Sequence, residues 1–320
     1  MEVCEISKGY ISTLRDLIEE WDCELQDALT EGKISKEEYK AKMPQMEIEL
    51  GRLQRECREL KIPVMIVFEG FGASGKGVQI GKLIQSMDPR GFQVFPIKAE
   101  TEDERMHPFL WRFWTKTPEA GRIAIFDGSW YRKVLIDRFE KRTREKEIET
   151  AFHSIEAFEK QLTDGGTILV KLLLDIDQKE QKKRFEKLLE KKETAWRVSQ
   201  GDRERNAKYS EYAAMMEEVL YRSDTKSAPW TVIEATDRRF ATVKIYMTVI
   251  HALAEAVEAV QRRRMEEQAI KAAEQVSGQQ EAAEIMRQAG GGLEMLQSSV
   301  LSRADLTLAY GKEEYEKAVR

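Results

Sequence analysis

Eight consecutive residues combine the side chains and main-chain freedom needed to hold a phosphate group: Gly70-Phe71-Gly72-Ala73-Ser74-Gly75-Lys76-Gly77. Glycines let the backbone curl so that several N–H groups point at one anion, and a lysine adds positive charge. The spacing is that of a Walker A loop, although Gly77 stands where a Ser or Thr usually binds magnesium. The alternative is a flexible turn that contains Gly-Lys by chance. An apolar run before the loop and an amphipathic helix pattern after it favour the phosphate-binding loop.

A candidate metal ligand follows another apolar run, residues 122–126, which ends at Asp127. Because parallel strands end at one edge of a sheet, Asp127 is expected to face the phosphate loop across a magnesium ion, as a Walker B carboxylate does. The alternative is that Asp127 caps the next helix. That helix carries two cations near its start, Arg132 and Lys133, which are candidates to contact phosphate.

Residues 191–208 are candidates for a lid over the site. This segment is basic, has few apolar residues and contains Arg197, Arg203 and Arg205. Closing cations over a phosphate ester screens its charge and expels water. An ordinary solvated connection is the alternative.

The elements that must position these residues follow an alternating pattern. Apolar runs at 63–69, 92–97, 122–127, 167–174 and 229–235 predict strands, separated by helical patterns that include 178–189 and a long helix after Asp237. This alternation predicts an α/β fold, P-loop kinase-like, whose parallel sheet has helices on both faces.

Three parts are predicted along the chain: a helical arm at 1–60, the phosphotransferase domain at 61–260, and a helical extension at 261–320. The arm shows a capping box at Ser35–Glu38 and an apolar stripe through Met46, Leu50, Leu53 and Cys57. The extension contains three glycines at 290–292, as a connector would.

Composition narrows the function classes. The 320 residues carry a net charge of -5, which argues against a non-specific nucleic-acid binder. No signal peptide or bilayer-spanning apolar run is evident, so we expect a cytoplasmic protein with no membrane partner. Cysteines 4, 23 and 57 and histidines 107, 153 and 251 lack metal-ligand spacing, and we interpret them as structural or surface residues.

Four ordered segments together resemble the polyphosphate kinase 2 family. They are the loop from Gly70 to Gly77, the Phe126-Asp127-x-Ser129-Trp130-Tyr131 segment, the run from His107 to Arg112, and Ala228-Pro229-Trp230. The resemblance covers about residues 35–255 and points in particular to tandem polyphosphate:AMP phosphotransferases, which carry two such domains.

The resemblance implies magnesium-dependent phosphoryl transfer between inorganic polyphosphate and a nucleoside mono- or diphosphate, with AMP to ADP as the expected reaction. It implies that Lys76 holds phosphate, that Asp127 binds Mg2+ and that Lys133 takes the place of a second arginine. Arg197 would belong to the lid. No protein base is needed, because transfer to an ionised phosphate depends on positioning and charge neutralisation.

Two glycines depart from the family pattern. Gly72 stands where the loop usually has aspartate, and Gly128 stands where the second motif usually has arginine. By analogy with arginine fingers, one such residue is worth about three to five orders of magnitude in rate. We therefore expect this copy to be weak or inactive.

Two rivals remain open. The first is an ATP-dependent nucleotide kinase, and the second is a non-catalytic domain that dimerises, braces a partner copy or binds polyphosphate. Lys36-Glu37-Glu38-Tyr39 recurs as Lys312-Glu313-Glu314-Tyr315, which predicts that a second copy, or a homo-oligomer in its place, completes the protein.

Overall fold

The computed structural model describes residues 32–288, with side chains up to residue 271. Residues 1–31 and 289–320 lie outside the described part, and with them Cys4, Cys23, the three glycines and the recurring Lys-Glu-Glu-Tyr segment. Contacts divide the chain into two compact units, residues 1–263 and 264–320.

The first unit is built on five parallel strands in the order β2-β3-β1-β4-β5. Their bounds are β1 Val64–Gly70, β2 Phe92–Pro96, β3 Ile123–Asp127, β4 Ile168–Asp175 and β5 Trp230–Glu234. All seven residues of the central strand β1 are buried. A strand that is apolar over nearly its whole length is what burial on both faces requires, and the parallel sheet confirms the predicted α/β class.

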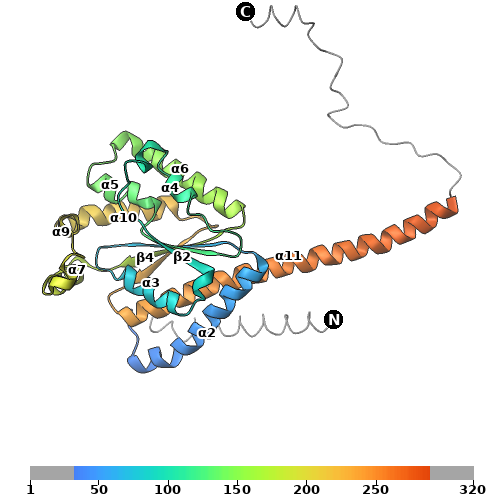
Figure 1. Cartoon of the computed structure of the whole chain (residues 1–320), viewed down its shortest axis with the longest axis horizontal. Helices are drawn as coiled ribbons and strands as arrows, with labels where there is room; N and C mark the ends of the chain where they lie inside the picture. The colour runs from blue at the N-terminus through green and yellow to red at the C-terminus, as the bar shows by residue number, and fades with distance from the viewer. Residues whose placement is uncertain (1–31, 289–320) are drawn as a thin grey trace, which may run out of the picture. The chain divides into compact units, whose positions relative to one another are not determined.

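Helices cover both faces of the sheet (Figure 1). On one side lie α4 (Trp111–Trp114), α5 (Ile136–Phe139), α6 (Glu145–Asp164) and α10 (Tyr209–Ser223); on the other lie α2 (Lys36–Leu60), α3 (Lys76–Gln85) and the first part of α11 (Arg238–Gln288). At one end of the sheet lie α7 (Gln178–Leu189), α8 (Lys192–Ala195) and α9 (Gln200–Ala207). Three 3-10 turns, Pro89–Gly91, Glu104–Met106 and Trp130–Lys133 (η3), complete the described elements.

Local signals in the sequence begin the helices where they were expected. Ser35 and Glu38 form the predicted capping box of α2, and the stripe from Met46 to Cys57 is buried. Asp237 accepts hydrogen bonds from the backbone N–H groups of Arg239 and Phe240 at the start of α11. The helix predicted at 178–189 is α7.

The expectation about apolar runs was wrong for one helix. By length and composition, Arg238–Lys271 of α11 could cross a membrane, yet 67% of its apolar window is buried inside the protein. Its apolarity comes from packing against the sheet: Phe240, Val243, Val249 and Leu253 are fully buried. A helix that is buried on most sides must be apolar on most sides.

Candidate active site

The loop between β1 and α3 has the conformation that its glycines predict. Gly70 and Gly75 have φ of 131° and 109°, in the range that favours glycine. A β-carbon on Gly70 would lie 2.2 Å from the carbonyl oxygen of Leu174 on β4, so the neighbouring strand also excludes a side chain there. Gly75 is the N-cap residue of α3, and the positive end of this helix faces the loop.

Lys76 folds back over this loop. Its Nζ donates hydrogen bonds to the carbonyl oxygens of Gly70, at 2.7 Å, and Phe71, at 3.2 Å. The ammonium group therefore lies above the loop that would surround a phosphate.

Two side chains of helix α7 donate hydrogen bonds to main-chain oxygens of the loop. Arg184 donates through Nη1 to the carbonyl oxygens of Ala73 and Ser74, and through Nη2 to those of Ala235 and Thr236. Gln181 Nε2 donates to the carbonyl oxygen of Gly72 at 3.0 Å. Both side chains are buried, and sequence reasoning missed them. Arg184 thereby links the loop to the residues between β5 and α11, and these hydrogen bonds involve no loop side chain.

Asp127 ends β3 beside the same loop. It pairs with Phe68 of β1 in the register of the sheet, and its Oδ2 lies 4.0 Å from the position of a β-carbon on Gly77. The carboxylate therefore faces the first turn of α3, where a Walker A hydroxyl would stand. The structure brings Lys76 and Asp127 to the same edge of the sheet.

A second carboxyl group, Glu69, is buried beneath the loop. Ser129 Oγ donates to Glu69 Oε1 at 2.7 Å, which joins the end of β1 to the residues after β3. Burial raises the pKa of Glu69 above its usual value, while the hydrogen bond from Ser129 and the charge of Lys76 act in the opposite direction. The signal in the sequence was an acid at the end of an otherwise apolar strand, directly before the loop.

The turn η3 carries the next two candidates. Arg132 Nε lies 3.3 Å from Asp137 Oδ1, and its buried Nε makes no hydrogen bond within the described part of the chain. Lys133 Nζ lies 5.9 Å from the ring centre of Phe109. Both side chains are half-buried and follow Asp127 by a short turn.

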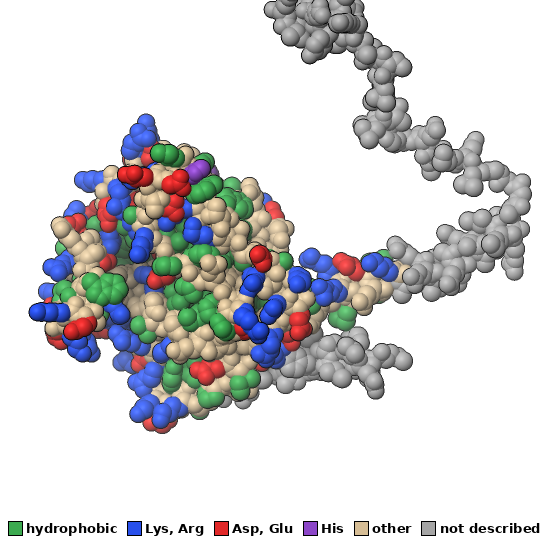
Figure 2. All heavy atoms as spheres, in the orientation of Figure 1, with side chains coloured by type: hydrophobic (Ala, Val, Ile, Leu, Met, Phe, Trp, Pro, Cys, Tyr) green, Lys and Arg blue, Asp and Glu red, His purple; other side chains and the backbone are tan. Residues whose placement is uncertain are grey.

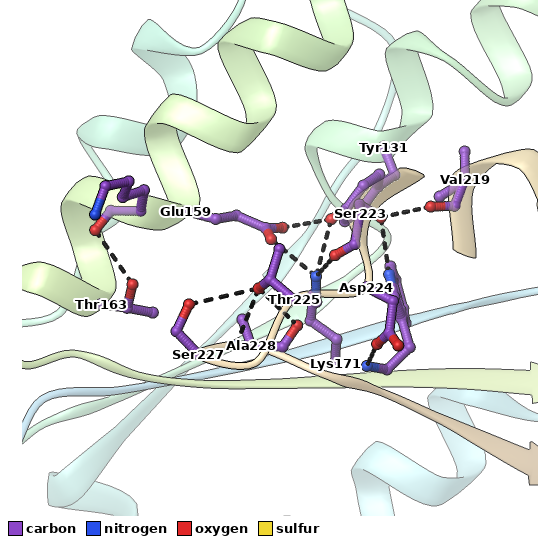
Figure 3. Close-up of polar contacts among 12 residues, drawn as sticks. Tyr131, Glu159, Thr163, Lys171, Val219, Ser223, Asp224, Thr225, Ser227 and Ala228 are labelled. Atoms are coloured by element: carbon purple, nitrogen blue, oxygen red, sulfur yellow. Dashed lines mark hydrogen bonds and ion pairs between the residues drawn. The ribbon is translucent and has the colours of Figure 1, made fainter. Parts of the chain in front are cut away.

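A buried polar network fixes this turn (Figure 3). Lys171 of β4 is fully buried and donates to Glu159 Oε2 of α6 at 2.8 Å and to the carbonyl oxygen of Ser223 at 2.7 Å. Glu159 Oε1 accepts from the Tyr131 hydroxyl at 2.5 Å, and it also accepts from Trp130 Nε1 at 2.9 Å. Because Trp130 and Tyr131 belong to η3, the network sets the position of Arg132 and Lys133.

The basic segment forms α8 and α9. Five lysines of α7 and α8 are exposed: Lys179, Lys182, Lys183, Lys187 and Lys192. Figure 2 shows Lys and Arg side chains on the surface at this end of the molecule. Arg197 is exposed, and its guanidinium lies over the ring of Trp196. Within the predicted lid segment, Asp202 Oδ1 lies 2.7 Å from the position of a β-carbon on Gly72. The part of the chain that the structure describes shows no contact between Arg197 and the loop.

The two departures from the family pattern have different surroundings. Gly128 has a φ of 76°, and its backbone N–H donates to the carbonyl oxygen of Phe68. A β-carbon there would meet Ile97 at 3.7 Å, an ordinary contact, so the backbone and not the space favours glycine. Gly72 has a φ outside the left-handed range, but the structure leaves too little space there for a β-carbon.

A glycine loop that presents a lysine, opposite an acid at the end of a neighbouring parallel strand, defines a P-loop protein of the phosphotransferase class. The family model described as Polyphosphate kinase 2 (PPK2) matches residues 33–263. The chain belongs to the polyphosphate kinase 2 family.

Relatives and solved structures agree with this membership. The chain is 37% identical over 223 residues to the polyphosphate:AMP phosphotransferase of Pseudomonas syringae pv. tomato, covering 70% of this chain and 45% of the relative. It is 30% identical over 223 residues to NDP-polyphosphate phosphotransferase 3 of Ruegeria pomeroyi, covering 70% and 74%. The crystal structure of polyphosphate kinase 2 from Arthrobacter aurescens TC1 superposes with a TM-score of 0.66 at 30% identity, covering 70% and 81%. The chain spans about half the length of the polyphosphate:AMP phosphotransferases that it matches.

Proposed function

We propose that this chain transfers a phosphoryl group between inorganic polyphosphate and an adenine nucleotide, with AMP to ADP as the main reaction. The observation that carries the proposal is the placement of Lys76 and Asp127 at one edge of the sheet, on either side of the loop and the first turn of α3. The names of three relatives, each a polyphosphate:AMP phosphotransferase, support AMP as the acceptor. We place this activity in the cytoplasm.

The residues at the site fit a magnesium ion. Mg2+ is usually held by one or two carboxylates together with substrate phosphates and water, so Asp127 is sufficient as its protein ligand. No group of three His, Cys, Asp or Glu side chains that could hold a metal converges among the described residues, and this mode of binding requires none. When bound, the ion neutralises charge on the transferring phosphoryl group.

The protein side chains supply charge and position. In this scheme Lys76 and the loop N–H groups hold the phosphates, while Arg132, Lys133 and Arg197 neutralise the polyanion along its length. Gly128 leaves the site without one cation next to Asp127, and we propose that turnover is slower for this reason.

The test is a turnover assay of the chain with Mg2+. Long polyphosphate and ATP are compared as donors to AMP and ADP, with Lys76→Ala as the impaired control. ADP formation from AMP and polyphosphate, lost in the control, would support the proposal. Faster transfer from ATP would favour a nucleotide kinase instead. Polyphosphate binding by titration without turnover would favour a non-catalytic half of a tandem protein.

A further inference from the structure

Position 72 is short of room because of the lid. A β-carbon on Gly72 would lie 2.7 Å from Asp202 Oδ1 and 3.3 Å from Phe185 Cζ. Real β-carbons essentially never approach heavy atoms within 3.0 Å, so any other residue at this position must shift the carboxylate of Asp202. The side chain that α9 places against the loop therefore favours glycine at position 72.

Asp202 is held in that place by the first turn of its own helix. Its Oδ2 accepts from Ser199 Oγ at 2.6 Å and from the Ser199 backbone N–H at 3.0 Å, and its Oδ1 accepts from Arg205 Nη2 at 2.7 Å. Burial alone would raise the pKa of Asp202, but the hydrogen bonds from Ser199 and the ion pair with Arg205 hold it below its usual value. The group on the loop is thus a carboxylate.

Arg205 ties the same helix to the rest of the site. It is buried, donates through Nη1 to Glu140 Oε1 at 2.9 Å, and lies over the ring of Tyr212. Tyr212 packs edge-on against Phe71 of the loop, at 5.8 Å between ring centres. Helix α9 therefore reaches the phosphate loop at two points, through Asp202 on Gly72 and through Arg205 and Tyr212 on Phe71.

We propose that Gly72 and Asp202 form a seat for the lid, in which the acidic group beside position 72 comes from α9 and not from the loop. Asp202 is then a positioning residue: it holds Arg205 in place and brings α9 down onto the loop over bound phosphate. The inference rests on the proposed function for the identity of that phosphate. On this account Gly72 is an adaptation to the lid, and an acid added at position 72 would push the lid away.

The test compares lid closure in four variants: Gly72→Ala, Gly72→Asp, Asp202→Ala, and the double variant Gly72→Asp/Asp202→Ala. Closure is measured as hydrogen exchange of amides at residues 199–207, with and without tripolyphosphate. Gly81→Ala is the matched glycine control, since a β-carbon there meets nothing within 4 Å. Glu204→Ala removes an exposed carboxylate from the same helix.

Gly72→Ala, Gly72→Asp and Asp202→Ala should each speed hydrogen exchange of the amides at residues 199–207 by about tenfold or more, as loss of a charge-assisted contact does. Each should also raise KM for polyphosphate more than it lowers kcat. The controls should leave exchange within about twofold of the parent. In the double variant the new carboxyl group takes up the vacated space beside Arg205, so its exchange should lie closer to the parent than either Gly72→Asp or Asp202→Ala.

The proposal that Gly72 and Asp202 form a seat for the lid would be overturned by either of two results. The first is an unchanged exchange rate in Gly72→Ala, and the second is an exchange rate in the double variant that equals the two single effects combined. If Asp202→Ala does not fold, Gly72→Ala decides the question alone. Absence of polyphosphate turnover in the parent would refute the proposed function, whereas the exchange data would still judge the seat.

Discussion

Replacing Glu159 by glutamine should show how strongly the buried network supports the fold. The substitution preserves the shape of the side chain, and its remaining oxygen can still accept from Trp130 and Tyr131. Lys171 loses its partner carboxylate, which lies 2.8 Å from its Nζ in a fully buried position. The ammonium group then stays in the interior with only a carbonyl and a hydroxyl oxygen to accept its protons.

The expected cost follows from that burial. Breaking a buried ion pair by removing one partner costs about 3–5 kcal/mol, because the remaining charge is not compensated. For a domain of this size about 1 kcal/mol corresponds to roughly 2–4 °C in Tm, so the loss should be about 6–20 °C. Lys171→Met/Glu159→Gln removes both charges and should recover more than half of it.

The pH dependence has a definite sign. Burial lowers the pKa of Lys171 below its usual value, so above that pKa the folded state binds fewer protons than the unfolded state. Stability from this group therefore rises with pH up to the pKa of the unfolded chain. Without Glu159 the pKa falls further, and in Glu159→Gln the rise should begin at lower pH.

The assay is thermal and urea unfolding of the parent, both single variants and the double variant. Lys160→Met is the matched control, because Lys160 and Asp164 form an exposed ion pair on the same helix at 2.8 Å. Such a pair is worth less than about 1 kcal/mol. A Glu159→Gln loss no larger than that of the control, or a double variant as unstable as the sum of the singles, would refute the argument.

Three further predictions concern the site itself. Lys76→Ala and Arg197→Ala should each weaken polyphosphate binding and flatten its salt dependence in titration calorimetry, and unchanged binding in Lys76→Ala would contradict its role. Arg184→Lys should speed hydrogen exchange in residues 72–75, because an ammonium group cannot donate to four carbonyl oxygens at once. Exchange at the parent rate would show that the four hydrogen bonds of the guanidinium are dispensable. Gly128→Arg should lower the free energy of unfolding by about 1–2 kcal/mol, because residue 128 has a left-handed backbone conformation. Gly166→Arg is the matched control in urea unfolding, since Gly166 also has a positive φ and its β-carbon would lie in open space. If the new arginine restores charge stabilisation, Gly128→Arg should also raise turnover while Gly166→Arg does not.

The sheet could be predicted because each strand is a compact apolar run that ends at a polar or glycine residue. Residues 122–127 show this well: the strand Ile123–Asp127 lies within the predicted run, and Asp127 ends it. The roles of Lys76, Asp127, Lys133 and Arg197 in catalysis and binding stay predictions, although the structure places the first two together.

The contacts that sequence reasoning missed depend on residues far apart in the chain. Lys171 lies among leucines in β4, and no local spacing indicates that Glu159 and Ser223 meet its ammonium group. Arg184 and Gln181 bind main-chain oxygens, which leave no trace in the residue types of the loop. Asp202 approaches Gly72 from α9, and no local spacing in the sequence indicates that these two residues meet.

The hydrogen bonds from α7 to the backbone of the loop have an evolutionary consequence. Arg184 and Gln181 hold the carbonyl oxygens of residues 72–74, which every amino acid possesses. Natural selection can therefore preserve the conformation of the loop backbone independently of the side chains that the loop presents. Side chains at positions 73 and 74 can therefore change without loss of these main-chain hydrogen bonds, whereas position 72 is restricted further by Asp202.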